Sequence, residues 1–326
     1  MFEKVAGILG FVLLMGLYEK YKQKQELNIE HKHYDIVSKF LLNEDEYKMM
    51  NSGLPILWIF IDYRKNARVW ENFGSRTSYA LNKPYQLITL KSIVKQASDD
   101  FHVCFVDDDS FGKLLSGEWN YNLSAIPDPM RSNLRMKGLY MLLYKYGGFL
   151  LPPSYLALKP LKHIFNEGLS RKDTFVGLKC NDIFVNTHEK YVPNIQFIGC
   201  KKHAEEINTI LQQIDNKLEK NKHFQNTNDF ECSVSQLLYK GISQGTVACE
   251  DAKRIGVETN ENTPVTTYDL FEGKEDILSN NLNGIYIPDD KLMTNHKFNW
   301  VLYITTQDII HMNNTIAYYM KHALEL

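Results

Sequence analysis

Continuous apolar runs and longer mixed segments alternate along this chain, and their lengths predict strands and helices in turn. The segment PILWIFID, residues 55–62, is an apolar run that begins at a proline and ends at an aspartate. Such a run is typical of a strand that is buried on both faces. The same pattern predicts further strands at 85–90, 101–109, 174–180 and 195–200.

The mixed segments between these runs predict helices. The clearest covers residues 129–148, with a proline near its start and Gly147–Gly148 at its end, which are typical helix boundaries. Further helices are predicted over 202–220 and 230–241, and a short one at FGKLL. Strands that alternate with helices predict an α/β fold, with a mostly parallel central sheet flanked by helices.

The N-terminal region contains an apolar run of a different kind. Residues 5–18, VAGILGFVLLMGLY, carry no charge, and several lysines follow them. A membrane-spanning helix needs about 20 apolar residues, although lysines at its ends can extend the reach of a shorter one. We interpret residues 1–25 as a hydrophobic, uncleaved membrane-anchor helix, because no small-residue cleavage site follows. The alternatives are a signal peptide and a helix that faces the core or a partner. The flanking charges leave the side of the membrane open.

The rest of the chain divides into a charged connector, residues 26–53, and one α/β domain, residues 54–326. Of the 326 residues, 44% are hydrophobic and 23% are charged, which is an ordinary globular composition. A net charge of −2 gives no strongly basic face, so nucleic acid is not an expected partner. The five cysteines are widely spaced without a CxxC pair, which argues against a zinc site and a disulfide framework.

One segment resembles a known family. The stretch IPDPMRSNLRMKGLYMLLYKYGGFLLPPSYLALKPL, residues 126–161, is similar to the sugar-binding region of the DXD glycosyltransferases. That group includes the initiating Golgi mannosyltransferases and the bacterial capsular polysaccharide synthesis proteins. The matching residues are Arg131, Arg135, Leu139, Tyr146, Gly147, Gly148, Pro160 and Leu161. A later segment, 193–211, also looks like the family's strand-to-helix segment, in which an asparagine precedes an apolar strand.

The resemblance implies a GT-A-like domain that binds a nucleotide sugar and a glycan or protein acceptor. It places the following residues in substrate binding: Arg131, Asn133, Arg135, Gly147, Gly148 and Ser154.

This chain departs from the family pattern at the acidic positions. The two DXD aspartates fall on Pro152 and Ser154, with Pro153 between them, and the helix aspartate falls on Asn133. In the family the DXD carboxylates are implied to hold Mn²⁺ and, through it, the nucleotide diphosphate. Proline offers no side-chain ligand to a hard cation, and serine offers a weak neutral one. Stabilisation of the leaving diphosphate would therefore have to come from other residues.

Other side chains could supply a displaced metal site for Mn²⁺. Asp107, Asp108 and Asp109 close a predicted strand at the sheet edge where α/β proteins bind ligands. The alternative is that Asp109 or Ser110 caps the short helix that follows while the other aspartates face water. His311 lies where some family members carry a late histidine near the metal, although a lone histidine is more often structural.

Two arginines offer a route that needs no metal. Arg131 and Arg135 lie one turn apart and so share one face of the predicted helix. They could clamp a diphosphate bidentately, or they could form ion pairs on the domain surface. A pocket, if one forms, is expected between these arginines, the aspartates at 107–109 and the loop at 152–154.

Three hypotheses follow from these residues. The first is an active membrane-anchored glycosyltransferase, which transfers a hexose from a nucleotide sugar to a glycan or protein acceptor. The second is an inactive pseudo-glycosyltransferase that keeps the fold as a binding or scaffold subunit. The third is an unrelated membrane-anchored α/β protein that resembles the family by accident.

Overall fold

The computed structural model describes residues 53–62, 83–181, 190–220, 227–273 and 278–325. The predicted anchor helix at 1–25 and all but the last residue of the connector at 26–53 lie outside these ranges. Within the described ranges, every helix is too short or too polar to cross a membrane.

A six-stranded sheet forms the centre of the described chain, in the order β2-β1-β3-β6-β5-β7. Strand β6 runs antiparallel to both of its neighbours, β3 and β5, and the other neighbouring pairs are parallel. The sheet is therefore mostly parallel, as predicted. Its strands are β1 (Ile56–Phe60), β2 (His102–Val106), β3 (Gly148–Leu150), β5 (Thr174–Cys180), β6 (Tyr191–Cys200) and β7 (Ala248–Cys249).

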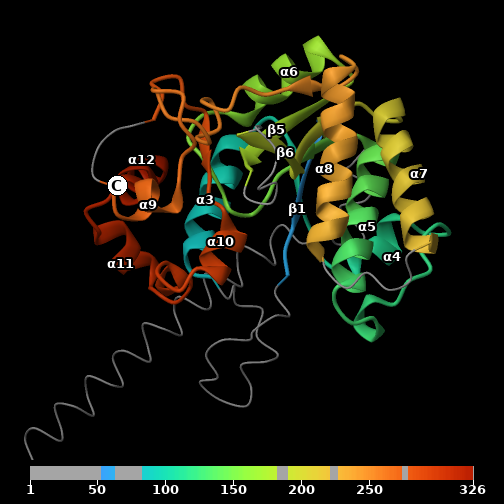
Figure 1. The fold of residues 1–326 in the computed structure, drawn as a ribbon, viewed down its shortest axis with the longest axis horizontal. Coiled ribbons are helices and arrows are strands. Elements are labelled where there is room, and N and C mark those ends of the chain that lie inside the picture. Colours follow the sequence, from blue (N-terminus) through green and yellow to red (C-terminus); the bar gives the residue numbers. More distant parts are fainter. Residues whose placement is uncertain (1–52, 63–82, 182–189, 221–226, 274–277, 326) are drawn as a thin grey trace, which may run out of the picture. The chain divides into compact units, whose positions relative to one another are not determined.

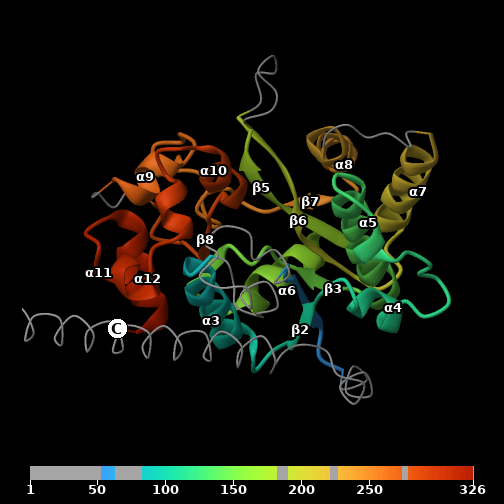
Figure 2. The ribbon, with the colours of Figure 1, turned by 90° about the horizontal axis from the view of Figure 1, so that it is seen from below.

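Helices cover both faces of this sheet (Figures 1 and 2). On one face lie α5 (Met130–Tyr146), α7 (Glu205–Lys220) and α8 (Thr227–Ser243), together with the short α4 (Ser110–Leu114). On the other face lie α3 (Tyr85–Ala97) and α6 (Leu161–Arg171). Alternate residues of a strand point to opposite faces of the sheet. Trp58 of β1 therefore packs on the α5 side, while Phe149 of the neighbouring strand β3 contacts Phe165 of α6 on the other side. Both faces are apolar, which explains the continuous apolar runs in the sequence.

A second, smaller core lies at the C-terminal end of the chain. It contains α9 (Thr267–Phe271), α10 (Asp289–Thr294), α11 (Thr306–His311) and α12 (Thr315–Leu324), with the 3₁₀ turn at Asn299–Leu302. A two-stranded antiparallel sheet of β4 (Tyr155–Ala157) and β8 (Gly284–Tyr286) joins this core to the loop after β3. Helix α3 also contributes to it through Tyr85 and Ile88.

One predicted element is wrong. Residues 85–90, which we expected to form a strand, are the first half of α3. This helix contacts β2, β4 and α6 as well as α11 and α12, so nearly every side of its first two turns is buried. A helix buried all round gives a continuous apolar run without the one-sided period of a surface helix, and such a run looks like a buried strand.

Candidate functional site

The carboxyl ends of β1 and β2 are joined by an arginine from α5. Arg135 donates from Nε and Nη2 to the two oxygens of Asp108, at 2.7 Å each, and from Nη1 to Asp62 at 2.8 Å. Its guanidinium group also lies 5.1 Å from the ring of Phe60. Each guanidinium nitrogen of Arg135 therefore has a carboxylate partner from the protein. This arrangement holds two loops together and leaves no open fork for a diphosphate.

The other arginine of the predicted clamp has a separate partner. Arg131 lies 3.3 Å from Asp128, which comes just before α5, and both side chains are partly exposed. Of the two alternatives for these arginines, the geometry favours ion pairing. Asn133 lies between them on the helix and is 2% exposed, and its Nδ2 has no hydrogen-bond partner among the described residues.

The three consecutive aspartates do not act as a group. Asp107 Oδ1 accepts hydrogen bonds from the backbone N–H and the hydroxyl of Ser110, at 2.8 and 2.5 Å, so Asp107 caps α4. Asp109 occupies the N-cap position but makes no capping hydrogen bond with its side chain, which corrects the expectation that Asp109 or Ser110 is the cap. Asp108 is held by Arg135.

The described residues contain no cluster of three or more histidine, cysteine, aspartate or glutamate side chains placed to hold a metal ion. His311 is exposed on α11, and its Nδ1 lies 2.7 Å from the carbonyl oxygen of Gln307 in the same helix. Metal ligation by Asp107, Asp108, Asp109 or His311 thus stays a prediction without support from this geometry.

The two glycines after α5 have a clear backbone role. Gly147 and Gly148 have φ angles of +70° and +107°, which side chains rarely allow, and they turn the chain from α5 into β3. A Cβ atom on Gly148 would collide with the carbonyl oxygen of Ile56 in the neighbouring strand. The indole N–H of Trp58 donates to the Gly147 carbonyl at 2.9 Å. Substrate binding by these glycines stays a prediction.

A cleft of about 260 Å³ lies beside the loop that follows β3. Pro153 and Ser154, from the loop that the resemblance aligns with the DXD motif, form part of its wall. The aspartates at 107–109 and the arginines Arg131 and Arg135 are not among the residues that line it. Of the predicted substrate-binding residues, Ser154 alone therefore lines this cleft. The cleft is thus not the pocket that was expected between the two arginines, the aspartates at 107–109 and the loop at 152–154.

The opposite wall of the cleft comes from β5, β6 and α8. Because β6 is antiparallel, its first residues lie beside the carboxyl end of β5, and Val192 pairs with Lys179. Asn194 on β6 is 3% exposed, and its Oδ1 accepts the backbone N–H of Gln196 at 3.0 Å. Its Nδ2 has no hydrogen-bond partner among the described residues. A residue that lines the cleft therefore carries a buried donor that no described residue satisfies.

Charged groups around the cleft are largely compensated. Lys179 Nζ lies 3.5 Å from Glu231 of α8. Asp289, at the start of α10, accepts a hydrogen bond from the Tyr85 hydroxyl and forms an ion pair with Lys83. These contacts hold α10 against α3 and fix one side of the cleft.

The remaining polar groups of the cleft can both donate and accept. Burial raises the pKa of Tyr286 well above its ordinary value, with help from the carboxylates of Asp290 and Asp289, so its hydroxyl is a neutral donor at physiological pH. Asp290 is exposed and lines the cleft as an acceptor. A mixed set of donors and acceptors with nearly balanced charge suits a neutral ligand that carries several hydroxyl groups.

Most residues of this cleft were not predicted from the sequence. No sequence motif contains Lys179, Tyr286, Asp289 or Asp290. These residues come together in the fold because β6 runs antiparallel to β5 and because β8 pairs with β4. A signal existed for Asn194, which is the asparagine that precedes an apolar strand in the family-like segment 193–211.

Comparison with known proteins gives little further guidance. No protein-family model matches the chain, and no curated protein matches it. A solved structure titled "PaToxG Glycosyltransferase" has a TM-score of 0.35 and 11% sequence identity, over 67% of this chain and 81% of that chain. A likeness at this level assigns neither a family nor a function.

Proposed function

We propose that this protein is glycosyltransferase-like and binds a nucleotide sugar, with the sugar in the cleft beside Ser154. The observation that carries the proposal is Asn194, a buried residue of that cleft's lining whose Nδ2 has no hydrogen-bond partner among the described residues. A buried donor without a partner costs about 1–3 kcal/mol, and a ligand oxygen at this position would recover that cost. Pro153 and Ser154, which lie in the segment 126–161 that resembles the sugar-binding region of DXD glycosyltransferases, supply the facing wall.

The chemistry of the cleft supports a sugar as the bound group. Sugar hydroxyls donate and accept hydrogen bonds, and the cleft offers amide and phenol donors together with carboxylate acceptors. Lys179 is paired with Glu231, so the cleft carries no surplus positive charge that would favour a diphosphate alone. In the active form of this proposal the sugar is transferred to a glycan or protein acceptor, and residues 1–25 anchor the protein to a membrane.

A second candidate function is binding without transfer. It is favoured by the ion pairs of the two arginines, because Arg135 is held by Asp62 and Asp108 while Arg131 lies against Asp128. The leaving diphosphate would then lack both the loop carboxylates and the arginine clamp as sources of stabilisation. A turnover assay separates the two candidates, because an inactive binding subunit releases no nucleotide diphosphate.

Calorimetric titration of the full chain with UDP, GDP, UDP-glucose and GDP-mannose, with and without Mn²⁺, tests the proposal. We expect at least one sugar nucleotide to bind. Substitution Asn194→Leu should weaken it about fivefold, the equivalent of one hydrogen bond of ~1 kcal/mol. Asn194→Asp, which keeps the acceptor for the Gln196 N–H, is the second variant if the first does not fold.

The matched control is Asn133→Leu, which removes another buried amide with an unpaired Nδ2 but does not line the cleft. Weaker binding in Asn133→Leu with unchanged binding in Asn194→Leu would move the site to the α5 side of the sheet. Absence of binding by all four compounds in both conditions would refute the proposal. Binding that requires Mn²⁺ would show that a metal takes part and would direct attention to Asp107–Asp109.

A further inference from the structure

A smaller apolar pocket adjoins the cleft. It has a volume of about 40 Å³, and three residues line both spaces, namely Lys179, Tyr286 and Asp290. We call this smaller space the side pocket; its apolar wall consists of Val192, Val257, Val265 and Pro288, with Cys180 beside them. The two spaces therefore meet at a polar boundary.

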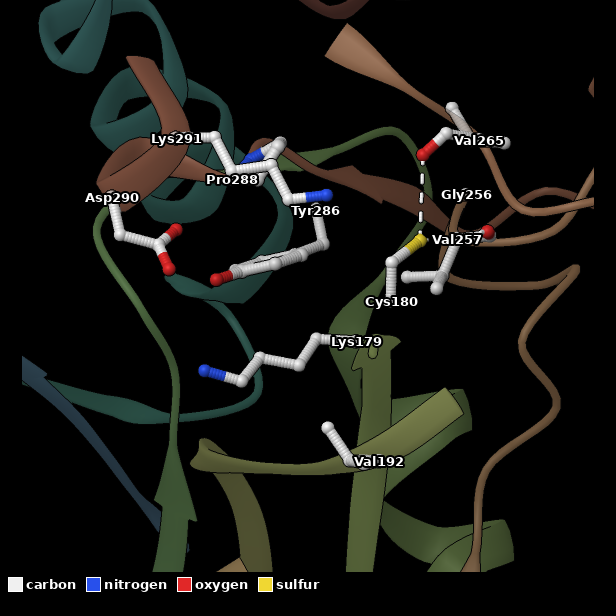
Figure 3. A pocket seen from close by; sticks show the side chains of 10 residues that line it. All are labelled: Lys179, Cys180, Val192, Gly256, Val257, Val265, Tyr286, Pro288, Asp290 and Lys291. Atoms are coloured by element: carbon white, nitrogen blue, oxygen red, sulfur yellow. Dashed lines mark hydrogen bonds between the residues drawn. The ribbon is translucent and has the colours of Figure 1, made fainter. Parts of the chain in front are cut away.

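Three polar side chains of the side pocket lie apart from its apolar ones, and the charged side chain of Lys291 also lines it. Figure 3 shows the ends of Lys179, Tyr286 and Asp290 gathered on one side, with Cys180, Val257 and Val265 on the other. The Cys180 thiol donates to the Val265 carbonyl oxygen at 3.4 Å, and the Val257 carbonyl oxygen lies 3.8 Å from the same sulfur. The thiol thus satisfies backbone acceptors at the far wall and leaves an apolar surface toward the pocket.

The size and lining of the side pocket limit what it can hold. Its volume is enough for a group of a few heavy atoms and far too small for a sugar ring or a nucleobase. Water needs two to four polar partners, and the valine side chains offer none, while the carbonyl oxygens of Val257 and Val265 already lie beside the Cys180 thiol, so an apolar group is the better occupant there. A group that enters from the cleft must also cross the boundary, where an ammonium, a phenol hydroxyl and a carboxylate lie.

We propose that the side pocket receives the acetamido group of the bound sugar, so that the ligand is a 2-acetamido sugar rather than a plain hexose. The methyl group would pack against the valines. The amide N–H would donate to Asp290, and the amide oxygen would accept from Lys179 or Tyr286. The inference rests on the proposed function, because it names the substrate class of the same cleft.

The test compares matched pairs of ligands by calorimetry with the full chain. The pairs are UDP-N-acetylglucosamine with UDP-glucose, and N-acetylglucosamine 1-phosphate with glucose 1-phosphate. The second pair does not depend on which nucleobase is recognised. We expect the acetamido member to bind at least about fourfold more tightly, the equivalent of burying one methyl-sized group.

Filling the side pocket should remove this preference. Substitution Cys180→Met places extra atoms in the pocket, and we expect the affinity ratio to fall from about four to about one. The control Cys249→Met makes the same change on β7, outside both spaces, and should keep the wild-type ratio. Val192→Ile, which adds one methyl group to another wall, serves as the second filling variant if Cys180→Met does not fold.

The outcomes separate this inference from the proposed function. Equal affinity for the two members of each pair would overturn the inference and leave the proposed function in place. A preference that persists in both filling variants would also overturn it, because the acetamido group would then lie elsewhere. Absence of binding by every sugar compound would overturn the inference together with the proposed function.

Discussion

The sequence predicts that Arg135 is important but does not predict which residues it contacts. Its position one turn after Arg131 suggested a shared clamp, but Asp62 and Asp108 come from loops after two different strands and meet it in the folded chain. The side chains of Arg135 and Asp108 are 8% and 7% exposed, so this is a nearly buried ion pair. Buried charges of this kind depend on each other, because each partner offsets the desolvation of the other.

The first prediction follows from that dependence. Substitution Arg135→Ala leaves two carboxylates without their cation, and we expect the free energy of unfolding to fall by about 3–5 kcal/mol. Urea denaturation followed by circular dichroism measures the change. Arg131→Ala is the control, because its partly exposed pair with Asp128 should contribute at most about 1 kcal/mol. Equal losses in the two variants would contradict the structural role that we assign to Arg135.

Among the elements, the junction of α5 and β3 decides where the cleft can form. Gly147 and Gly148 end the helix and start the strand within two residues, and the loop at 152–154 follows directly. Gly148 approaches the backbone of β1 so closely that no side chain fits there. The Gly-Gly signal was visible in the sequence because left-handed backbone conformations are a local property of glycine.

The second prediction concerns this junction. Substitution Gly148→Ala combines an unfavourable backbone conformation with a clash against Ile56, so we expect a loss of about 3 kcal/mol or more in stability. The comparison is Gly117→Ala, at a glycine with φ of +83° and open space where a Cβ atom would lie, so only the backbone cost of about 1 kcal/mol applies. Thermal and urea unfolding of both variants give the two values. Similar losses would show that the close approach to β1 is unimportant.

At the scale of the whole described domain, α3 connects the two cores. Tyr85 and Ile88 belong to the C-terminal core, whereas the same helix contacts β2 and α6 beside the large sheet. The cleft lies where these two parts meet, with β5 and β6 on one side and α10 on the other. A rigid cleft therefore requires that both cores fold together.

The third prediction tests this coupling. Met320 on α12 is fully buried in the C-terminal core, and Met320→Ala should lower the stability by about 2–5 kcal/mol. Hydrogen exchange measured by mass spectrometry should show the same loss of protection in peptides that contain β1 and α12, because α3 links the cores. The control Met293→Ala, at a side chain that is 44% exposed, should change stability by no more than about 0.5 kcal/mol. Unchanged protection of β1 in Met320→Ala would show that the cores unfold separately.

The amino-acid sequence by itself determined the class of the fold and the main strands and helices of the larger core, but no element after α8. Buried strands β1, β2, β5 and β6 appear as apolar runs, and α5 appears with its proline and glycine boundaries, because chain period and end signals are local. The predicted bounds of α7 and α8 differ from the observed ones by up to three residues. Residues 85–90 of α3 predict a strand, because a helix that is buried on nearly every side has a continuous apolar run without a one-sided helical period. That burial comes partly from the C-terminal helices and is a tertiary effect. The resemblance to DXD glycosyltransferases also drew attention to the loop at 152–154, where Pro153 and Ser154 line the cleft, and sugar binding there stays a prediction.

Only the tertiary structure decided which side chains meet there. Lys179 and Asn194 lie far from Tyr286 and Asp290 in the chain. The two pairs come together through the antiparallel strand β6 and the short antiparallel pairing of β4 with β8. The same packing turned Arg135 and Asp108 toward each other and away from the cleft. Contacts between distant residues depend on strand order and helix packing, which no local pattern encodes, so the site could be named only after the fold was known.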